Sequence, residues 1–172
     1  MEYLKSNEFF ANLEDANAHA CLARPWLIAD NLRTPENLGS LIRLADNIGA
    51  GHMIFLGENT FKAGRIRYAA ASSINNVSWS FSTSGDIRSL IPEGYTLVAL
   101  ETASGATNLF ETRLPERMAV IVGSERNGIS PEVLKQADIA VFIPVPGPTR
   151  SLNVSHAASV LLFEWLRQMT TR

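Results

Sequence analysis

The chain has 172 residues, of which 46% are hydrophobic and 19% charged, so it fits one folded domain and excludes disordered, collagen-like and disulfide-scaffold classes. Its formal net charge is -2, which gives the whole molecule no cationic surface for non-specific binding of nucleic acid. Any nucleic-acid partner must therefore be bound by local groups.

Hydrophobic spacing predicts helices that alternate with short strands. Apolar residues recur every three to four positions in the helices, whereas the strands are continuous apolar runs. The predicted elements, in chain order, are a helix over 6–22, a strand over 26–29, a helix over 38–48, a strand over 52–56, a short helix over 65–73, a short strand over 77–81, a short helix over 86–90, strands over 95–100, 118–122 and 139–143, and a helix over 154–169. Fully apolar strands that alternate with helices indicate an α/β fold with a parallel sheet.

The last predicted helix is apolar nearly all round, so it needs two surfaces to bury against. One surface is the sheet, and we expect the other to be a second subunit, with Leu162 and Trp165 pointing outward. The sequence therefore predicts a homodimer.

The numbers and positions of cysteine, histidine and charged residues indicate the cellular location and bear on metal binding. Cys21 is the only cysteine, and the three histidines are scattered, which predicts neither a disulfide nor a metal site. Residues 1–25 carry several charges, and nowhere is there an apolar run of about 18 residues. These features predict a soluble, cytoplasmic protein without a signal peptide or a membrane span.

Three polar loops follow predicted strands, at residues 31–43, 123–131 and 144–155. Ligands bind beyond the carboxyl ends of the strands in open parallel sheets, so these loops predict a site. Simple structural interpretations also exist, namely helix capping by Asn37, by Ser130 before Pro131, and by Ser151 or Asn153, and an ion pair between Arg43 and Asp46. Capping does not explain Glu125 in a loop flanked by glycines, so the three loops together favour a site.

Two other stretches of the sequence partly match binding motifs. Gly49-Ala50-Gly51 is similar to the start of a dinucleotide-binding turn, but it precedes a strand where that turn must follow one. The basic stretch 64–67, with Tyr68 beside it, fits either a solvated helix face or an RNA contact.

The three loops resemble, in order and spacing, the three motifs of the SpoU (TrmH-like) family of S-adenosylmethionine-dependent RNA ribose 2′-O-methyltransferases, within the SPOUT superfamily of knotted methyltransferases. The stretches that carry the resemblance are NLRTPENLGSLIRLADNIGA, IVGSERNGIS and IPVPGPTRSLNVSHAASVLLFEW. The resemblance covers about residues 25–168. It implies a Rossmann-like domain over 25–172 with a C-terminal deep trefoil knot, preceded by a helical lead-in over 1–24.

The resemblance also implies the site residues, the cofactor and the partners. The catalytic set is Asn37, Arg43, Glu125, Ser151 and Asn153; the cofactor-binding set is Leu100, Glu101, Gly123, Ile143 and Leu152; the RNA-binding set is Arg33, Arg65, Arg67, Arg126 and Arg150. The implied cofactor is S-adenosyl-L-methionine, and the implied partners are tRNA or rRNA and a second copy of the chain. The implied reaction is methyl transfer to a ribose 2′-hydroxyl, and the alternative is an RNA-binding protein that retains the fold without catalysis.

Two roles of Arg43 stay open at this point. An arginine acts as a general base only after losing its proton, which costs about 8 kcal/mol at neutral pH because the guanidinium holds that proton far above pH 7. A protonated arginine can instead bind the phosphate beside the target ribose and stabilise developing negative charge.

Overall fold

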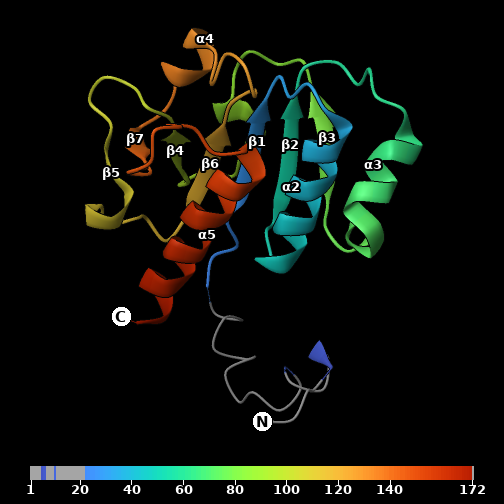
Figure 1. Cartoon of the computed structure of the whole chain (residues 1–172), viewed down its shortest axis with the longest axis horizontal. Coiled ribbons are helices and arrows are strands. Elements are labelled where there is room, and N and C mark those ends of the chain that lie inside the picture. Colours follow the sequence, from blue (N-terminus) through green and yellow to red (C-terminus); the bar gives the residue numbers. More distant parts are fainter. Residues whose placement is uncertain (1–4, 7–9, 11–21, 172) are drawn as a thin grey trace.

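The computed structural model describes residues 5, 6, 10 and 22–171 (Figure 1). Most of the helix predicted over residues 6–22 lies outside the described residues. The division into a lead-in over 1–24 and a domain over 25–172 stays a prediction.

A parallel sheet forms the centre of the fold, as predicted. Its seven strands within the described residues are β1 (Trp26–Asp30), β2 (His52–Leu56), β3 (Trp79–Ser82), β4 (Thr96–Leu100), β5 (Thr107–Asn108), β6 (Met118–Val122) and β7 (Ile139–Phe142). Their spatial order is β3-β2-β1-β6-β4-β7-β5, and every strand pair is parallel. All carboxyl ends therefore face one edge of the sheet, which is the upper edge in Figure 1.

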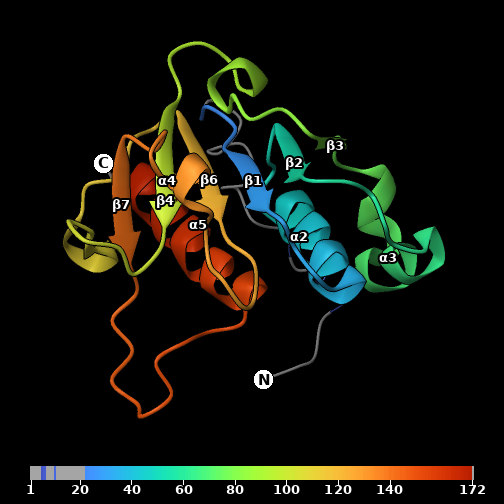
Figure 2. The same ribbon diagram turned by 90° about the horizontal axis from the view of Figure 1, so that it is seen from above.

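Helices cover both faces of this sheet. The helices are α2 (Pro35–Asn47), α3 (Ala63–Ala70), α4 (Pro131–Leu134) and α5 (Val154–Thr170), with short 3-10 turns at Ala71–Asn75, Arg88–Leu90 and Leu109–Glu111. The apolar side chains of α2 and α5 share one core with the sheet, and those of α4 and of residues 87–91 form the core on the opposite face. Helices α2 and α5 lie side by side (Figure 2), and α3 packs on the other side of α2.

Three short elements differ from the sequence predictions. The helix predicted over 65–73 stops at Ala70, because Ala71 has a φ of 51° and the chain continues as a 3-10 turn. The helix predicted over 86–90 is only a 3-10 turn, where the Asp86 carboxylate accepts a hydrogen bond from the Ser89 N–H. Strand β5 was not predicted because its two residues are too short for a hydrophobic pattern.

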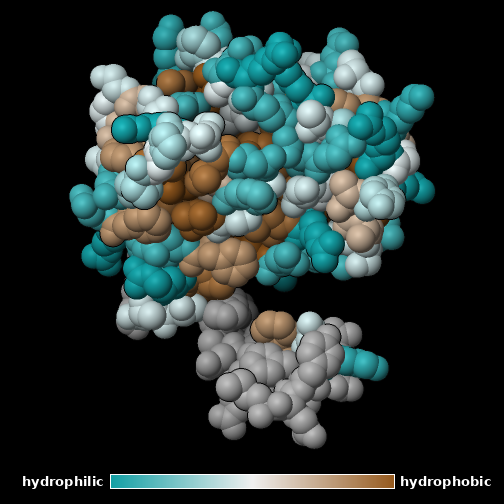
Figure 3. All heavy atoms as spheres, in the orientation of Figure 1, coloured by the Kyte–Doolittle hydropathy of each residue, from teal (hydrophilic) through white to brown (hydrophobic). Residues whose placement is uncertain are grey.

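The outward side of α5 is not the predicted one. Leu162 is 0% exposed and Trp165 is 2% exposed, and the Trp165 indole donates a hydrogen bond to the Pro115 carbonyl. Phe163 is 50% exposed instead, and Val160 is half-buried. An all-round apolar pattern cannot indicate which stripe faces the sheet, which explains the error. Hydrophobic atoms gather on the face of the molecule where α5 lies (Figure 3).

Two further predictions concern the membrane and the knot. No helix among the described residues combines the length and the hydrophobicity needed to span a bilayer. The deep trefoil knot, in which the last strands and helix would thread the chain end through a loop, stays a prediction.

Candidate active site at the carboxyl edge of the sheet

The segment after β1 enters α2 through a capped turn. Thr34 is the N-cap, and its hydroxyl accepts a hydrogen bond from the Asn37 N–H at 3.4 Å, while Pro35 occupies the first helical turn. The interpretation of Asn37 as the cap is therefore wrong, because Thr34 holds that position. Asn37 lies inside the first turn with 9% of its surface exposed, and its side-chain amide makes contacts other than capping.

Glu125, in the second polar loop, binds the first loop, and Asn37 of the first loop binds the third. Its carboxylate accepts hydrogen bonds from the Arg33 N–H at 3.0 Å, from the Thr34 hydroxyl at 2.9 Å and from the Asn37 amide at 2.6 Å. The Asn37 carbonyl oxygen in turn accepts from the Asn153 amide at 3.0 Å. Three residues predicted from separate motifs thus form one hydrogen-bonded chain, Glu125–Asn37–Asn153.

Asn153 both caps α5 and takes part in this chain of hydrogen bonds. It is the N-cap of α5, as one structural interpretation expected, and its side-chain oxygen accepts from the Ser155 N–H at 2.9 Å and from the Ser155 hydroxyl at 2.7 Å. Ser155 was not predicted, although the Asn-x-Ser spacing at a helix start is a recognisable capping signal. The cap fixes the Asn153 amide toward Asn37.

The hydrogen bonds around Glu125 keep it ionised. Partial burial raises the pKa of this carboxyl, but the hydrogen bonds from Asn37, from the backbone of its own loop and of Arg33, and from Thr34 outweigh burial and hold the pKa below its usual value. Glu125 therefore acts as an anionic acceptor that orders the loop of residues 31–37.

The loop that carries Glu125 is compact because of two glycines. A side chain at Gly123 would overlap the backbone of Gly128, and Gly128 has a φ of +65°, a left-handed conformation that glycine adopts without strain. Glu101, at the end of β4, fastens this loop through a hydrogen bond from the Ile129 N–H at 3.0 Å. Its other oxygen accepts from the Thr102 N–H at 2.9 Å, so one carboxylate orders two loops.

A buried carboxylate that sequence reasoning missed also holds this edge. Asp30 is 2% exposed at the end of β1, and it accepts hydrogen bonds from the Ser130 N–H at 2.6 Å and the Asn31 amide at 2.7 Å. The Ser130 side chain makes no capping hydrogen bond, although it precedes Pro131 as predicted. The available signal was a single acidic residue at the end of an apolar run.

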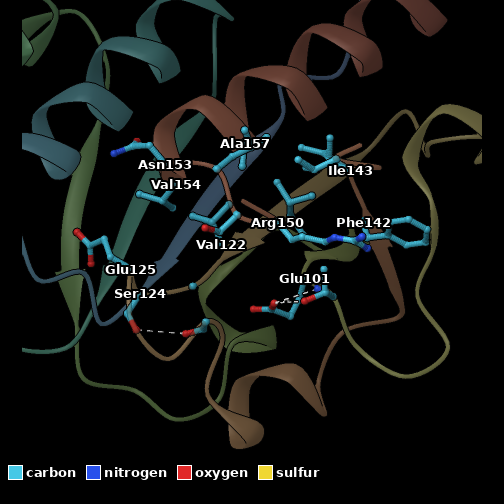
Figure 4. A pocket seen from close by; sticks show the side chains of 17 residues that line it. Glu101, Val122, Ser124, Glu125, Phe142, Ile143, Arg150, Asn153, Val154 and Ala157 are labelled. Atoms are coloured by element: carbon cyan, nitrogen blue, oxygen red, sulfur yellow. Dashed lines mark hydrogen bonds between the residues drawn. The ribbon is translucent and has the colours of Figure 1, made fainter. Parts of the chain in front are cut away.

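A pocket of about 460 Å³ opens between these loops at the carboxyl ends of β4, β6 and β7 (Figure 4). Every residue of the predicted cofactor set lines it: Leu100, Glu101, Gly123, Ile143 and Leu152. Three of the predicted catalytic residues line it as well: Glu125, Ser151 and Asn153. In Figure 4, Glu125 and Asn153 lie at one end of the pocket, and Phe142 and Ile143 lie at the other.

Arg43 lies apart from this pocket. It is exposed on α2, six residues beyond Asn37, which corresponds to about 9 Å along a helix axis. It does not line the pocket and forms no ion pair with any described residue. The pair expected with Asp46 does not form, since the Asp46 carboxylate accepts from the Asn76 amide instead.

The predicted RNA-binding arginines fall into two groups. Arg150 lines the pocket, while Arg33 and Arg126 are exposed in the loops beside it. Arg65 and Arg67 lie on α3, where Arg65 pairs with Glu36 at 2.6 Å and both side chains are exposed. Among the described residues, no group of His, Cys, Asp or Glu is arranged to hold a metal ion.

Comparison with known proteins identifies the family. Residues 25–163 match the model of the SpoU rRNA Methylase family. The chain belongs to this SpoU family. A relative from Mycolicibacterium smegmatis, described as an uncharacterized tRNA/rRNA methyltransferase, is 36% identical over 159 residues, which are 89% of this chain and 50% of the relative. This chain spans about half the length of several curated SpoU relatives it matches.

Solved structures share the SpoU fold. An AdoMet-bound rRNA methyltransferase from Sinorhizobium meliloti is 29% identical with a TM-score of 0.75, over 85% of this chain and 57% of its own. A structure concerned with the 2-OH methylation of C/U34 on tRNA is 27% identical with a TM-score of 0.77, over 87% of this chain and 99% of its own. These likenesses agree with the predicted SpoU family and α/β fold.

Proposed function

We propose that the chain transfers the methyl group of S-adenosyl-L-methionine to a ribose 2′-hydroxyl in tRNA or rRNA. The observation that carries this proposal is the chain of hydrogen bonds Glu125–Asn37–Asn153, which joins all three family motifs at the mouth of the pocket. Family membership and the names of the relatives support the same reaction class.

The pocket suits the cofactor in size and in chemistry. Ligand pockets are typically about 300 to 1,000 Å³ and mostly apolar with a few placed polar groups. Here Val122, Ile143 and Leu152 supply apolar walls, and Glu101 supplies a fixed carboxylate. The bound cofactor supplies a methyl group already activated on a sulfonium. The remaining task of the protein is to align a ribose hydroxyl and to accommodate its proton.

Neutral amides orient the hydroxyl in this proposal. Asn153 lies at the pocket and already donates one hydrogen bond to Asn37, whose position Glu125 fixes. Groups fixed before the substrate arrives lose little entropy on binding, so positioning supplies much of the rate enhancement. Ser151, exposed at the pocket, offers a hydroxyl to the same substrate.

Arg43 is proposed to act as a protonated phosphate ligand. Its exposed guanidinium has no partner among the described residues, so it is available to bind a phosphate in two-point fashion. Its place outside the pocket of its own chain supports a site completed by a second subunit. We therefore propose a homodimer, formed through the exposed side of α5 around Phe163, in which Arg43 borders the partner's pocket.

RNA capture relies on local arginines rather than net charge. Arg33, Arg126 and Arg150 surround the pocket and are proposed to bind backbone phosphates near the target, with Arg65 and Arg67 reaching phosphates farther along. The proposed location is the cytoplasm, where tRNA and rRNA are available. A non-catalytic RNA-binding role fits less well, because the full hydrogen-bonded set of motif residues is present.

Ligand-dependent melting tests the proposed cofactor. We expect S-adenosylmethionine and S-adenosylhomocysteine to raise the melting temperature, because a ligand at 100 times its Kd adds about 2.7 kcal/mol to a native state that alone binds it. NAD and ATP serve as matched controls and are expected to have no effect. Equal shifts with all four compounds, or none with any, would contradict the cofactor assignment.

A further inference from the structure

A second pocket lies on the other side of the loop that Glu125 binds. It measures about 220 Å³ and lies at the carboxyl ends of β1, β2 and β3, where residues between 57 and 61, in the segment that leads from β2 to α3, also line it. Leu32 lines this pocket, and the next residue, Arg33, donates its N–H to Glu125. The two pockets are thus separated by one short stretch of chain.

The walls of this second pocket are aromatic and apolar. Phe55 and Phe81 have ring centroids 5.4 Å apart, and both rings line the pocket together with Phe61. Phe55 is fully buried, but Phe61 and Phe81 are only half-buried, so these two residues keep part of their surface accessible. A small planar group could therefore stack here, as nucleobases do on aromatic side chains in single-strand-binding proteins.

The rim adds polar groups and positive charge. Asn31, Glu58 and Thr60 are exposed at the pocket. The Asn31 carbonyl oxygen and the Thr60 hydroxyl offer neutral hydrogen-bonding groups to the edge of a base, and the Glu58 carboxylate offers an acceptor for its N–H groups. Arg33 and Lys62, the residues directly after Leu32 and Phe61, are exposed and form no ion pair with any described residue. A pocket with aromatic walls and these two cations next to its lining residues suits a base whose phosphates lie nearby.

The position of the second pocket fits an RNA strand at the active site. Residues 31–34 run from the second pocket to Thr34, which binds Glu125 of the first pocket, and four residues of extended chain span at most about 14 Å. A ribose at the Asn37–Asn153 end of the first pocket would bring its own base, or the neighbouring one, within reach of the second. We propose that the second pocket holds a nucleobase of the substrate RNA at or beside the methylated nucleotide, which rests on the proposed function.

A pair of RNAs that differ only in their bases tests this proposal. The probes are a short fluorescent single-stranded RNA and the same ribose-phosphate backbone with abasic sites, measured by anisotropy with S-adenosylhomocysteine present. We expect Phe61→Ala to weaken binding of the base-bearing RNA about 10-fold and to leave the abasic RNA unchanged, because only stacking is lost. Phe61→Leu, which keeps the apolar packing, should show the same loss, and Phe61→Tyr should retain wild-type binding.

The control variant is Phe110→Ala, which removes an exposed aromatic ring from a different part of the chain. It should leave both RNAs bound as in the wild type. Wild-type affinity for the base-bearing RNA in both Phe61→Ala and Phe61→Leu, or equal weakening of both RNAs, would overturn the base pocket. S-adenosylhomocysteine melting shifts on the same variants separate this failure from a failure of the proposed function, since the cofactor pocket does not include Phe61.

Discussion

At the scale of single residues, Glu125 has the most connections in the site. It accepts hydrogen bonds from a backbone N–H, a hydroxyl and an amide, so both of its oxygens are occupied. Through the family resemblance, the sequence suggested a direct catalytic role for this carboxylate. The structure shows that it orders the start of α2 instead, because Thr34 and Asn37 lie within its reach.

Glu125→Gln should therefore destabilise the start of α2 and lower the stability of the folded protein. We expect a loss of about 1 to 2 kcal/mol in the free energy of unfolding at neutral pH, because an amide cannot accept all three hydrogen bonds. Glu93→Gln, an exposed residue away from the site, is the matched control and should change stability little. Calorimetry measures both, and 1 kcal/mol corresponds to about 2 to 4 °C at this chain length.

The lowered pKa of Glu125 determines how the stability difference between wild type and Glu125→Gln changes with pH. A depressed folded-state pKa stabilises the protein fully above the unfolded value of about 4.3, and the stabilisation is lost as the pH falls through the folded-state pKa. The gap between wild type and Glu125→Gln should therefore narrow below about pH 4.3. A gap that stays constant on acidification would show that the carboxylate charge is not what orders the loop.

At the scale of elements, α5 shows what a sequence pattern can and cannot predict. Its extent was predicted to within a residue, because a long apolar helix between polar ends is a strong signal. Its outward side was predicted wrongly, because Leu162 and Trp165 face the core and Phe163 faces outward. Only packing against the sheet decides which stripe of an all-apolar helix is buried.

Phe163→Glu tests the proposed dimer through α5. Because Phe163 is 50% exposed, a charge there should leave the subunit folded but place an unpaired carboxylate in the subunit interface. We expect a monomer in sedimentation equilibrium with a loss of methyl transfer. Tyr68→Glu, at a 91% exposed aromatic on α3, should stay dimeric. A dimeric and fully active Phe163→Glu protein would rule out this interface.

Helix α2 supplies a separate test of a site shared between subunits. Arg43→Ala and Asn153→Ala should each be inactive alone. Co-expressed, they should form mixed dimers with one complete site, giving about a quarter of wild-type activity if pairing in a two-fold dimer is random. If Arg43 serves the pocket of its own chain, the mixture stays inactive.

At the scale of the whole molecule, the sequence predicted the parallel sheet and a pocket at the carboxyl edge of that sheet. Continuous apolar strands separated by helices leave few arrangements, and ligands bind where parallel strands end. The order β3-β2-β1-β6-β4-β7-β5 did not follow, because strand order depends on contacts between residues far apart in the chain. The hydrogen bonds that join Glu125, Asn37 and Asn153 could not be predicted either, although the three motifs indicated each of these residues separately.

Methyl transfer to RNA is the measurement that tests the central claim most directly. Purified protein, S-adenosylmethionine with a labelled methyl group, and unmodified tRNA and rRNA are incubated together, and nucleosides from the digested RNA are identified by mass spectrometry. The account predicts label in a 2′-O-methylated nucleoside at one site, and a loss of about 100-fold or more in rate for Arg43→Ala, which removes charge stabilisation in the transition state. Label on a base instead of a ribose, or full activity in Arg43→Ala, would contradict the account.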